Sequence, residues 1–445
     1  MIQWSLKGKV HYEYLKTIVG DTDLELYLSA RSPFFSMRRW TMLLFIVLIA
    51  LTQGCAVVPV RAPLPEELSG IAQIPGIPDA RIWGDEPPAN IEKRWLSLSQ
   101  ADMEKRYSGI IRQEHDYLAI SGGGDNGAFG AGLLVGWTAA GTRPEFTVVT
   151  GISTGALMAP FAFLGPAYDN QLREVYTKYS TKDLIRRLNI LTILTGHAVV
   201  STKPFKALLA KHYTQEMMDA IASEYRRGRV LYIGTTDLDA GRPVIWNIGR
   251  IAASGEPGAL ELFHKVILAS ASIPAVFPPV LIKVEAEGLR YDEMHVDGGT
   301  TSQIFLYPAG LDWRLITDKL EVSGTPRVYL IRNARLEPEW EAVKPKLTSI
   351  AGRSIGSLIR TQGIGDMIRM YGNAIRDGMD YHLAYIPSEF TDKPEEVFDP
   401  EYMGKLFDLG FELAKSGYEW DKAPPGLGLT EQRPEPGGDS TKGEE

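Results

Sequence analysis

Two glycine-rich turns, each after a short apolar run, constrain the fold of this chain most strongly. The first run, Tyr117–Ile120, is followed by Ser-Gly-Gly-Gly-Asp-Asn-Gly. The second, Phe146–Thr150, is followed by Gly-Ile-Ser-Thr-Gly, with Ser153 at its centre. Each half predicts a strand, a tight turn and then a helix, and such turns can present backbone N–H groups or one exposed side chain. Together they predict a serine nucleophile beside N–H donors.

The G-x-S-x-G motif places Ser153 between Gly151 and Gly155. A serine at this position sits on a sharp strand-to-helix bend, where glycines two residues away avoid a clash of Cβ atoms. The hydroxyl would then lie at a helix N-terminus, whose dipole favours negative charge. Because the motif also occurs by chance, it indicates a nucleophile only together with partners.

The first turn offers Gly122, Gly123 and Gly124 as an oxyanion hole, because glycine allows backbone N–H groups to approach a ligand. The turn also satisfies G-x-G-x-x-G, ending at Gly127, so a dinucleotide site is the alternative. That site needs an acidic residue at the end of the next strand, whereas Glu145 precedes that strand. A phosphate-binding P-loop is excluded, because the Lys-Ser/Thr pair is missing.

The helix after this turn is rich in glycine, with Gly127, Gly130, Gly132 and Gly136. Each glycine inside a helix costs about 1 kcal/mol relative to alanine. Close packing of this helix on another element would offset that cost.

A serine nucleophile needs a base, and the sequence leaves two possibilities open. One is a Ser-His-Asp triad that uses His295, His264 or His382. The other is Asp297 alone, which follows a short strand and precedes Gly298 and Gly299.

The glycine loop, G-x-S-x-G about thirty residues later and D-G-G well downstream resemble, in this order, the three signatures of the patatin-like phospholipases. Thr235–Asp239 and Ala269–Pro279 add to the resemblance, which spans Tyr117 to Asn333. It implies a three-layer α/β/α domain with a largely parallel sheet, and a Ser–Asp dyad without histidine. By position Ser153 matches the nucleophile, Asp297 the base and Gly122, Gly123 and Gly124 the oxyanion hole. The implied reaction is hydrolysis of acyl-ester lipids without a cofactor.

Two positions depart from the family pattern. The family usually has Asp before the three glycines and Arg or Lys two places after them, where this chain has Ser121 and Asn126. The missing basic side chain puts electrostatic help to the oxyanion in doubt, and Asp125 adds a negative charge beside the loop.

The N-terminal region resembles a bacterial lipoprotein signal peptide. Basic residues after Met37 precede the apolar run Met42–Leu51, and Leu51-Thr-Gln-Gly-Cys55 resembles a lipobox. Ten apolar residues are too short to span a bilayer, which needs about 20. We therefore expect Cys55 to be lipidated and to anchor the protein, and Ala56 after it favours the outer membrane, facing the periplasm.

The chain thus divides into five expected parts. Residues 1–54 form a signal region, with 1–36 as a possible mis-assigned start and 37–54 as the signal peptide. Residues 55–113 form a lipidated tether and lead-in, with one helix at Ile91–Arg106. The catalytic domain covers 114–335, a helical extension packed on it covers 336–420, and a disordered tail covers 421–445.

Within the catalytic domain strands and helices alternate, which favours an α/β fold with a largely parallel sheet. Strands are expected at Tyr117–Ile120, Phe146–Thr150, Val230–Thr235, Pro243–Asn247, His295–Val296 and Arg327–Ile331. Helices are expected at Ala128–Ala140, Ala156–Leu164, Gln171–Tyr179, Lys203–His212, Thr214–Arg227 and Leu260–Ala271.

Three further segments carry expectations. Leu347–Arg376 predicts a long helix, which its glycines could break in two and which packs on the sheet or faces a membrane. Pro400–Gly417 predicts the last helix. Ile190–Leu194 is expected to pack in the core or line an acyl channel.

Composition narrows the remaining functions. A net charge of −8 argues against nucleic acid as a partner. One cysteine and seven scattered histidines provide no metal signature. The favoured function is a membrane-tethered phospholipase or lysophospholipase; the alternatives are an acyltransferase or esterase with the same dyad, and a catalytically silent lipid-binding lipoprotein.

Overall fold

The computed structural model describes residues 61–427 except 185, 188–199, 275 and 339. Contacts divide the chain into two units, Met1–Arg61 and Ala62–Glu445, and the sheet, its helices and the candidate site belong to the second. The predicted signal peptide, Cys55 and Ile190–Leu194 lie outside the described residues, so their roles stay predictions.

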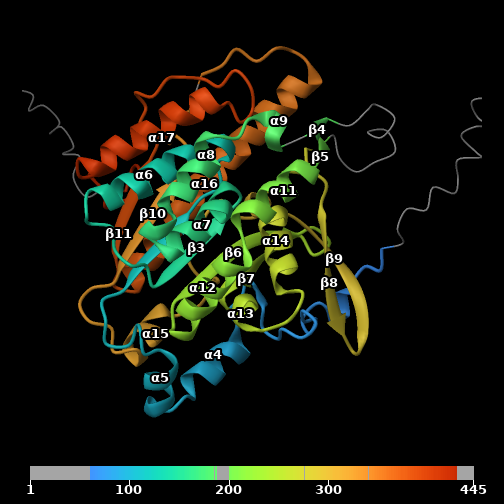
Figure 1. The fold of residues 1–445 in the computed structure, drawn as a ribbon, viewed down its shortest axis with the longest axis vertical. Coiled ribbons are helices and arrows are strands. Elements are labelled where there is room, and N and C mark those ends of the chain that lie inside the picture. The colour runs from blue at the N-terminus through green and yellow to red at the C-terminus, as the bar shows by residue number, and fades with distance from the viewer. Residues whose placement is uncertain (1–60, 185, 188–199, 275, 339, 428–445) are drawn as a thin grey trace, which may run out of the picture. The chain divides into compact units, whose positions relative to one another are not determined.

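A nine-stranded sheet forms the centre of the molecule (Figure 1). Its parallel strands lie in the order β6, β3, β2, β10, β11, with bounds Val230–Asp237, Val148–Ile152, Asp116–Ile120, Arg327–Arg332 and Asp380–Tyr385. The antiparallel strands lie beyond and beside β6 and are β1 (Arg81–Trp83), β7 (Arg242–Asn247), β8 (Val280–Ala286) and β9 (Leu289–Asp297). The predicted, largely parallel α/β fold is therefore confirmed.

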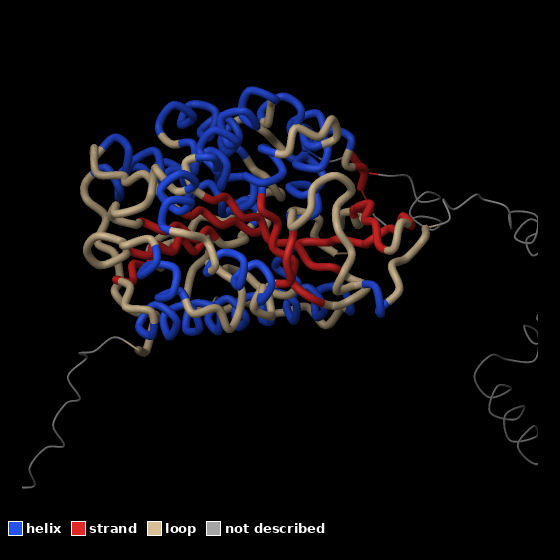
Figure 2. The backbone as a smooth tube through the Cα atoms, turned by 90° about the horizontal axis from the view of Figure 1, so that it is seen from below, coloured by secondary structure: helices blue, strands red, loops and turns tan. Residues whose placement is uncertain are grey.

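Alternating side chains of the parallel strands supply two separate hydrophobic cores. Leu118 and Ile120 of β2 belong to one cluster, whereas Tyr117 and Ala119 belong to the other. Successive strand residues point to opposite faces, so both faces of this sheet are covered. Figure 2 shows the strands as a red layer between two layers of blue helices, which is the expected α/β/α arrangement.

The predicted helices are found to within a few residues, with one exception, and Thr181–Leu184, Ile248–Ala253 and Trp313–Lys319 are helices that the sequence did not predict. They are α4 (Ala89–Leu96), α5 (Gln100–Arg106), α6 (Gly127–Ala139), α7 (Thr154–Leu164), α8 (Asp169–Thr177), α9 (Thr181–Leu184), α11 (Lys203–His212), α12 (Gln215–Arg226), α13 (Ile248–Ala253), α14 (Ala259–Ser270), α15 (Trp313–Lys319), α16 (Leu347–Arg376) and α17 (Pro400–Lys415). The single helix predicted at Ile91–Arg106 is wrong, because the side chain of Ser99 accepts the amide proton of Asp102 and starts a new helix there.

The glycines of α6 allow α17 to pack against it at short range. A Cβ at Gly132 would lie 1.9 Å from the carbonyl oxygen of Phe407, and one at Gly136 would lie 2.2 Å from that of Phe411. On the facing helix, a Cβ at Gly410 would lie 2.3 Å from the carbonyl oxygen of Phe129. The close packing predicted from the glycine pattern is thus confirmed.

Segments expected to lie outside the catalytic domain are parts of its sheet. β1 pairs with β7, and Gln73 forms a bridge with Glu285 of β8, so much of the predicted tether at 55–113 is an ordered edge. β11 pairs in parallel with β10, so residues 336–420 contribute a strand as well as helices. The start of the predicted disordered tail is also ordered, because Asp421 forms a bridge with Leu383 of β11.

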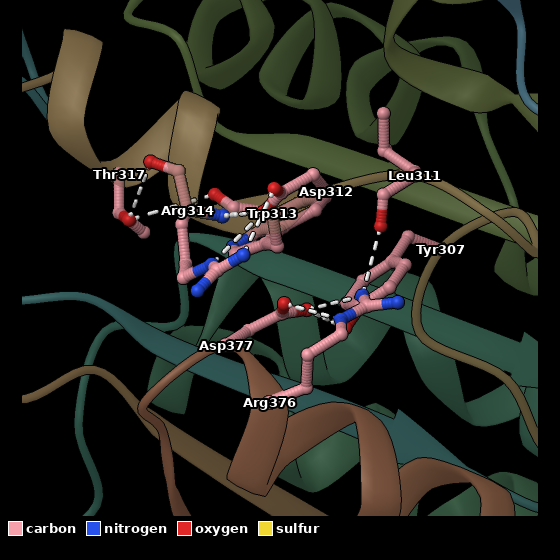
Figure 3. A network of polar contacts seen from close by, with 8 residues as sticks. All are labelled: Tyr307, Leu311, Asp312, Trp313, Arg314, Thr317, Arg376 and Asp377. Atoms are coloured by element: carbon pink, nitrogen blue, oxygen red, sulfur yellow. Dashed lines mark hydrogen bonds and ion pairs between the residues drawn. The ribbon is translucent and has the colours of Figure 1, made fainter.

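A buried polar network fixes the C-terminal end of α16 (Figure 3). The Arg376 guanidinium donates to both carboxylate oxygens of Asp377 at 2.7 Å and to the carbonyl of Leu311 at 2.9 Å. The hydroxyl of Tyr307 donates to Asp377, and its ring stacks on Trp313 with 4.7 Å between centroids. α16 is one continuous helix, so the glycines do not break it.

Among residues 61–427 as described, none of the helices has the length and apolar character needed to cross a bilayer.

Candidate active site

Two strands that run in opposite directions meet end to end beside β6 and bring Ser153 and Asp297 together. β3 ends with Ile152 opposite Gly234 of β6. β9 arrives from the other direction and ends with Asp297 opposite Thr235, the next residue of β6. The residue after β3 is Ser153, and its Oγ donates a hydrogen bond to Oδ2 of Asp297 at 2.7 Å.

Ser153 occupies the strained bend that the G-x-S-x-G motif predicts. Its φ of 54° and ψ of −121° lie in a region that non-glycine residues rarely adopt. The flanking glycines are required by space: a Cβ at Gly151 would lie 2.2 Å from the carbonyl oxygen of Gly155, and one at Gly155 would lie 2.4 Å from that of Ile120. The bend places Ser153 at the N-terminus of α7.

Asp297 is buried, and its surroundings raise its pKa. Burial raises the pKa to about 6, although the hydrogen bonds from Ser153 and from the amide of Gly299 work in the opposite direction. The amide of Gly299 donates to Oδ1 at 2.7 Å, so each carboxylate oxygen has one donor. A carboxylate with a pKa near neutrality suits a general base.

Two serines at the C-terminal end of α14 hold the backbone of the pair, and the sequence pattern assigns them no role. The hydroxyl of Ser270 accepts the amide proton of Ser153 at 2.9 Å and donates to the carbonyl of Gly234 at 2.6 Å. The amide of Asp297 donates to the carbonyl of Ser272 at 2.9 Å. In the sequence, Ala269–Pro279 contributes only to the family resemblance. In the structure, its two serines hold the backbone of Ser153 and Asp297 in place.

The glycine loop lies over the serine, but its three amides are not equivalent. A Cβ at Gly122 would lie 3.3 Å from Cβ of Ser153, so the loop and the nucleophile are in close contact. The amide of Gly122 donates to the carbonyl of Gln303 at 3.1 Å and is therefore already occupied, which corrects its predicted place in the oxyanion hole. Within the described part of the chain, no hydrogen bond joins the amides of Gly123, Gly124 or Thr154 to another residue.

The two departures from the family pattern both have structural partners. Ser121 Oγ donates to the carbonyl of Gly122 at 2.7 Å and accepts the amide proton of Asn333 at 2.9 Å. Asn126 accepts a hydrogen bond from the Tyr402 hydroxyl of α17 at 2.6 Å. Ser121 thus fixes the start of the loop, and Asn126 fixes its end to a neighbouring helix. Burial raises the pKa of Asp125 between them.

The histidines considered for a triad have other partners. Nδ1 of His295 contacts Oγ1 of Thr235 at 3.0 Å, and Nε2 of His264 contacts the carbonyl of Tyr213 at 2.7 Å. The His382 ring stacks on Tyr329, with 4.5 Å between centroids. Across the described residues, neither Ser153 nor Asp297 forms a hydrogen bond with any of the three.

One buried group could hold a metal by its geometry. Ligand atoms of Asp237, Glu293 and His295 lie within 4.8 Å of one another, and this is the single such group among the residues that the structure describes. The guanidinium of Arg81 forms an ion pair with Glu293 in the same cluster. Because the guanidinium of Arg81 already compensates the charge of Glu293, the cluster serves to join β1, β6 and β9.

Ser153 lies at a strand-to-helix bend and is hydrogen-bonded to a carboxylate in a three-layer α/β/α fold. This architecture is that of the serine acyl hydrolases. Residues 118–309 match the family model described as patatin-like phospholipase, so this part of the chain is a patatin-like phospholipase domain. The match includes both glycine turns and the D-G-G segment.

Further comparisons add little to this match. The crystal structure of VipD from Legionella pneumophila is similar at 12% sequence identity and a TM-score of 0.35. The alignment covers 68% of this chain and 66% of that one, just under two thirds of its length. No curated protein sequence matches this chain.

Proposed function

We propose that this protein is a membrane-tethered phospholipase or lysophospholipase that cleaves fatty-acyl esters through a Ser153–Asp297 dyad. The observation that carries the proposal is the 2.7 Å hydrogen bond between Ser153 Oγ and Asp297 Oδ2, formed at a strained bend under the glycine loop. The family match supports lipid substrates, and the lipobox-like Cys55 supports a tether to the membrane that holds them, facing the periplasm.

In the first half-reaction, Asp297 Oδ2 accepts the proton of Ser153 Oγ while Oγ attacks the acyl carbonyl carbon. The carbonyl oxygen gains negative charge, which the amides of Gly123, Gly124 and Thr154 stabilise together with the N-terminal end of α7. The tetrahedral intermediate then expels the alcohol of the lipid, which takes the proton from Asp297. An acyl ester on Ser153 remains.

In the second half-reaction, Asp297 accepts a proton from water, which attacks the acyl ester on Ser153. The intermediate collapses, the fatty acid leaves, and the proton on Asp297 returns to Ser153 Oγ. One carboxylate thus serves as base in each attack and as acid in each departure. No step requires histidine, because Asp297 contacts the serine directly.

The test uses the compact unit Ala62–Glu445 and compares hydrolysis of phospholipid, lysophospholipid and a soluble short-chain ester. Ser153→Ala and Asp297→Asn should each lower turnover by a factor of about 10³ or more. His264→Gln and His382→Gln, at two candidate histidines that contact neither member of the dyad, should retain turnover. Equal activity of the wild type and Ser153→Ala would refute the enzyme and favour a lipid-binding role; transfer of the acyl group to an added alcohol in preference to water would favour a transferase.

The tether is tested separately in the full chain. Labelled palmitate should enter the wild type and not Cys55→Ser, and equal labelling of the two would contradict the lipobox. Because the tether and the dyad occupy different units, either part of the proposal can fail without the other.

A further inference from the structure

The two halves of α16 have opposite environments. In the C-terminal half, Met367, Met370 and Ala374 are buried in the second hydrophobic core. In the N-terminal half, Leu347–Thr361, none of the side chains whose burial is described is buried. We refer to Leu347–Thr361 as the exposed half of α16, which belongs to the orange helix of Figure 1.

The apolar side chains of this half point away from the body of the protein. Exposed large hydrophobic residues occur at Leu347, Ile350, Ile355, Leu358 and Ile359, and Leu358 is 69% exposed. At 100° per residue these five positions fall within an arc of about 180°. A helix that packs on a core buries its apolar arc, whereas the apolar arc of this half of α16 faces solvent.

The arginines of the same half face the opposite side, where they bind the preceding loop. Arg360 donates to the carbonyl of Leu336 at 3.0 Å, and Arg353 lies 3.8 Å from the carboxylate of Glu341. These contacts fix the rotation of the helix about its axis. The apolar arc therefore cannot turn inward without breaking them.

The loop before the helix adds an aromatic ring and positive charge. Trp340 is 86% exposed, and Lys344 and Lys346 are exposed as well. Residues 340–361 contain four basic residues and one acidic one, Glu341, in a chain whose net charge is −8. Exposed tryptophan beside lysines and aliphatic residues is typical of a surface that lies in the interface of an anionic bilayer.

The exposed half of α16 ends near the proposed catalytic dyad. Gln362, the residue that follows it, accepts a hydrogen bond from Gln303 Nε2 at 3.1 Å, and the same nitrogen donates to the carbonyl of Gly299 at 2.7 Å. The amide of Gly299 in turn donates to Asp297. Ile359 and Leu358 therefore lie about one turn of helix from Gln362, which is linked to Asp297 through Gln303 and Gly299.

The opposite end of α16 is held by the network of Arg376, Asp377 and Tyr307 (Figure 3). α16 leads into β11, so this end lies where the parallel strands begin. The exposed half accordingly lies toward the edge where the parallel strands end, and Ser153 follows the end of β3 at that edge.

We propose that the exposed half of α16, with Trp340, Lys344 and Lys346, is a docking surface for an anionic lipid bilayer. The apolar arc enters the acyl boundary, the tryptophan and the lysines remain at head-group level, and the bilayer is thereby held beside the dyad. This inference rests on the proposed function in taking lipid as the substrate, but the docking itself needs no catalysis. It acts independently of the lipid anchor expected at Cys55.

The test measures co-sedimentation of Ala62–Glu445 with phosphatidylcholine vesicles that contain or lack phosphatidylglycerol. Ile355→Ser with Leu358→Ser should weaken binding at least about tenfold. Lys344→Glu with Lys346→Glu should abolish the preference for phosphatidylglycerol. Leu289→Ser, at a 61% exposed leucine of β9, is the matched control and should bind as the wild type does.

Hydrolysis separates this inference from the proposed function. Ile355→Ser with Leu358→Ser should keep wild-type turnover of a soluble short-chain ester and lose hydrolysis of phospholipid in vesicles, whereas Ser153→Ala should bind vesicles normally and hydrolyse neither. Unchanged vesicle binding in Ile355→Ser with Leu358→Ser would overturn the docking surface. If the wild type is a dimer and this variant is a monomer that still binds vesicles, the surface is a dimer interface instead. Failure of all forms to hydrolyse the soluble ester would refute the enzyme and leave the binding result to stand.

Discussion

The hydroxyl of Ser270 accepts the backbone amide proton of Ser153 at 2.9 Å while it donates to the carbonyl of Gly234 at 2.6 Å. Because Ser153 has a φ of 54°, its backbone amide does not follow the hydrogen-bonding pattern of the sheet or of α7. The hydroxyl of Ser270 accepts its proton instead. The contact ties the strained residue to β6. Asp297, the last residue of β9, pairs with Thr235 of the same strand. Ser270 is thus placed to position the nucleophile without touching the substrate.

Ser270→Ala should lower kcat for a soluble ester about tenfold and change KM little, because a displaced nucleophile affects the transition state more than ground-state binding. Ser272→Ala is the matched control, since its hydroxyl donates only to the carbonyl of Leu268 at 2.7 Å. A fall in KM and kcat together, or equal losses in both variants, would indicate a general structural role for Ser270.

The activity should depend on a single ionisation near pH 6. Burial raises the pKa of Asp297 to about 6, and only the ionised carboxylate can accept the proton of Ser153. kcat/KM for the soluble ester should therefore fall about tenfold per pH unit below pH 6 and be level above pH 7. The measurement is a pH profile between pH 4.5 and 8. A profile that retains full activity at pH 4.5 would contradict a raised pKa of Asp297 in the active enzyme.

Local sequence patterns predicted the layers of this fold and the position of Ser153, and the family resemblance selected Asp297 over a histidine as its partner. Ser153 and Asp297 stand out because glycines must flank them at short spacing. Ser270, Gln303 and Asn333 do not stand out, because their partners lie far away along the chain; Ser270 is 117 residues from Ser153. Pairing of distant strands likewise decided that β1 and β11 belong to the sheet.

α16 illustrates a different limit of sequence reasoning. Its glycines predicted a possible break, yet Gly352, Gly356 and Gly365 face open space and leave the helix continuous. The sequence pattern could not show which side of the helix faces the body, because that depends on contacts such as the one between Arg360 and Leu336.

Loss of Asp377, the buried partner of Arg376, should lower the free energy of unfolding far more than loss of an exposed partner in a surface ion pair. The side chain of Asp377 is 0% exposed and binds both Arg376 and the hydroxyl of Tyr307. Asp377→Ala leaves two donors without their acceptor and should lower the free energy of unfolding by about 2–4 kcal/mol. Glu412→Ala, which removes an exposed ion pair with Lys415, should cost less than about 1 kcal/mol. Urea denaturation measures both, and equal losses would contradict the importance of the network.

Packing between α6 and α17 gives a test that is independent of charge. Gly132→Ala would place a methyl group 1.9 Å from the carbonyl oxygen of Phe407, so the helices must separate, and we expect a loss of at least about 2 kcal/mol. Gly372→Ala in α16 meets open space and should stabilise the protein by about 0.5–1 kcal/mol. Thermal unfolding of the two variants should therefore shift in opposite directions, and a neutral Gly132→Ala would refute the close contact.

Asp297 should also lower the stability of the folded protein at neutral pH. Its pKa is raised from 3.8 to about 6, so the folded state binds the proton more tightly than the unfolded state does. For such a carboxyl group the stabilising contribution is complete below pH 3.8 and is lost as the pH rises through 6. At 1.36 kcal/mol per pKa unit, burial of the ionised form costs about 3 kcal/mol above pH 7.

Asp297→Asn keeps the shape of the side chain and removes that charge. We therefore expect it to abolish hydrolysis and to raise the melting temperature at pH 8, with a smaller gain at pH 5 because part of the wild-type carboxylate is already protonated there. Asp318→Asn, on the surface of α15, should shift neither melting temperature by more than a degree or so. If Asp297→Asn melts below the wild type at pH 8, the carboxylate must be stabilised by its two hydrogen bonds more than it is penalised by burial, and the base would then have a pKa too low to explain an activity transition near pH 6.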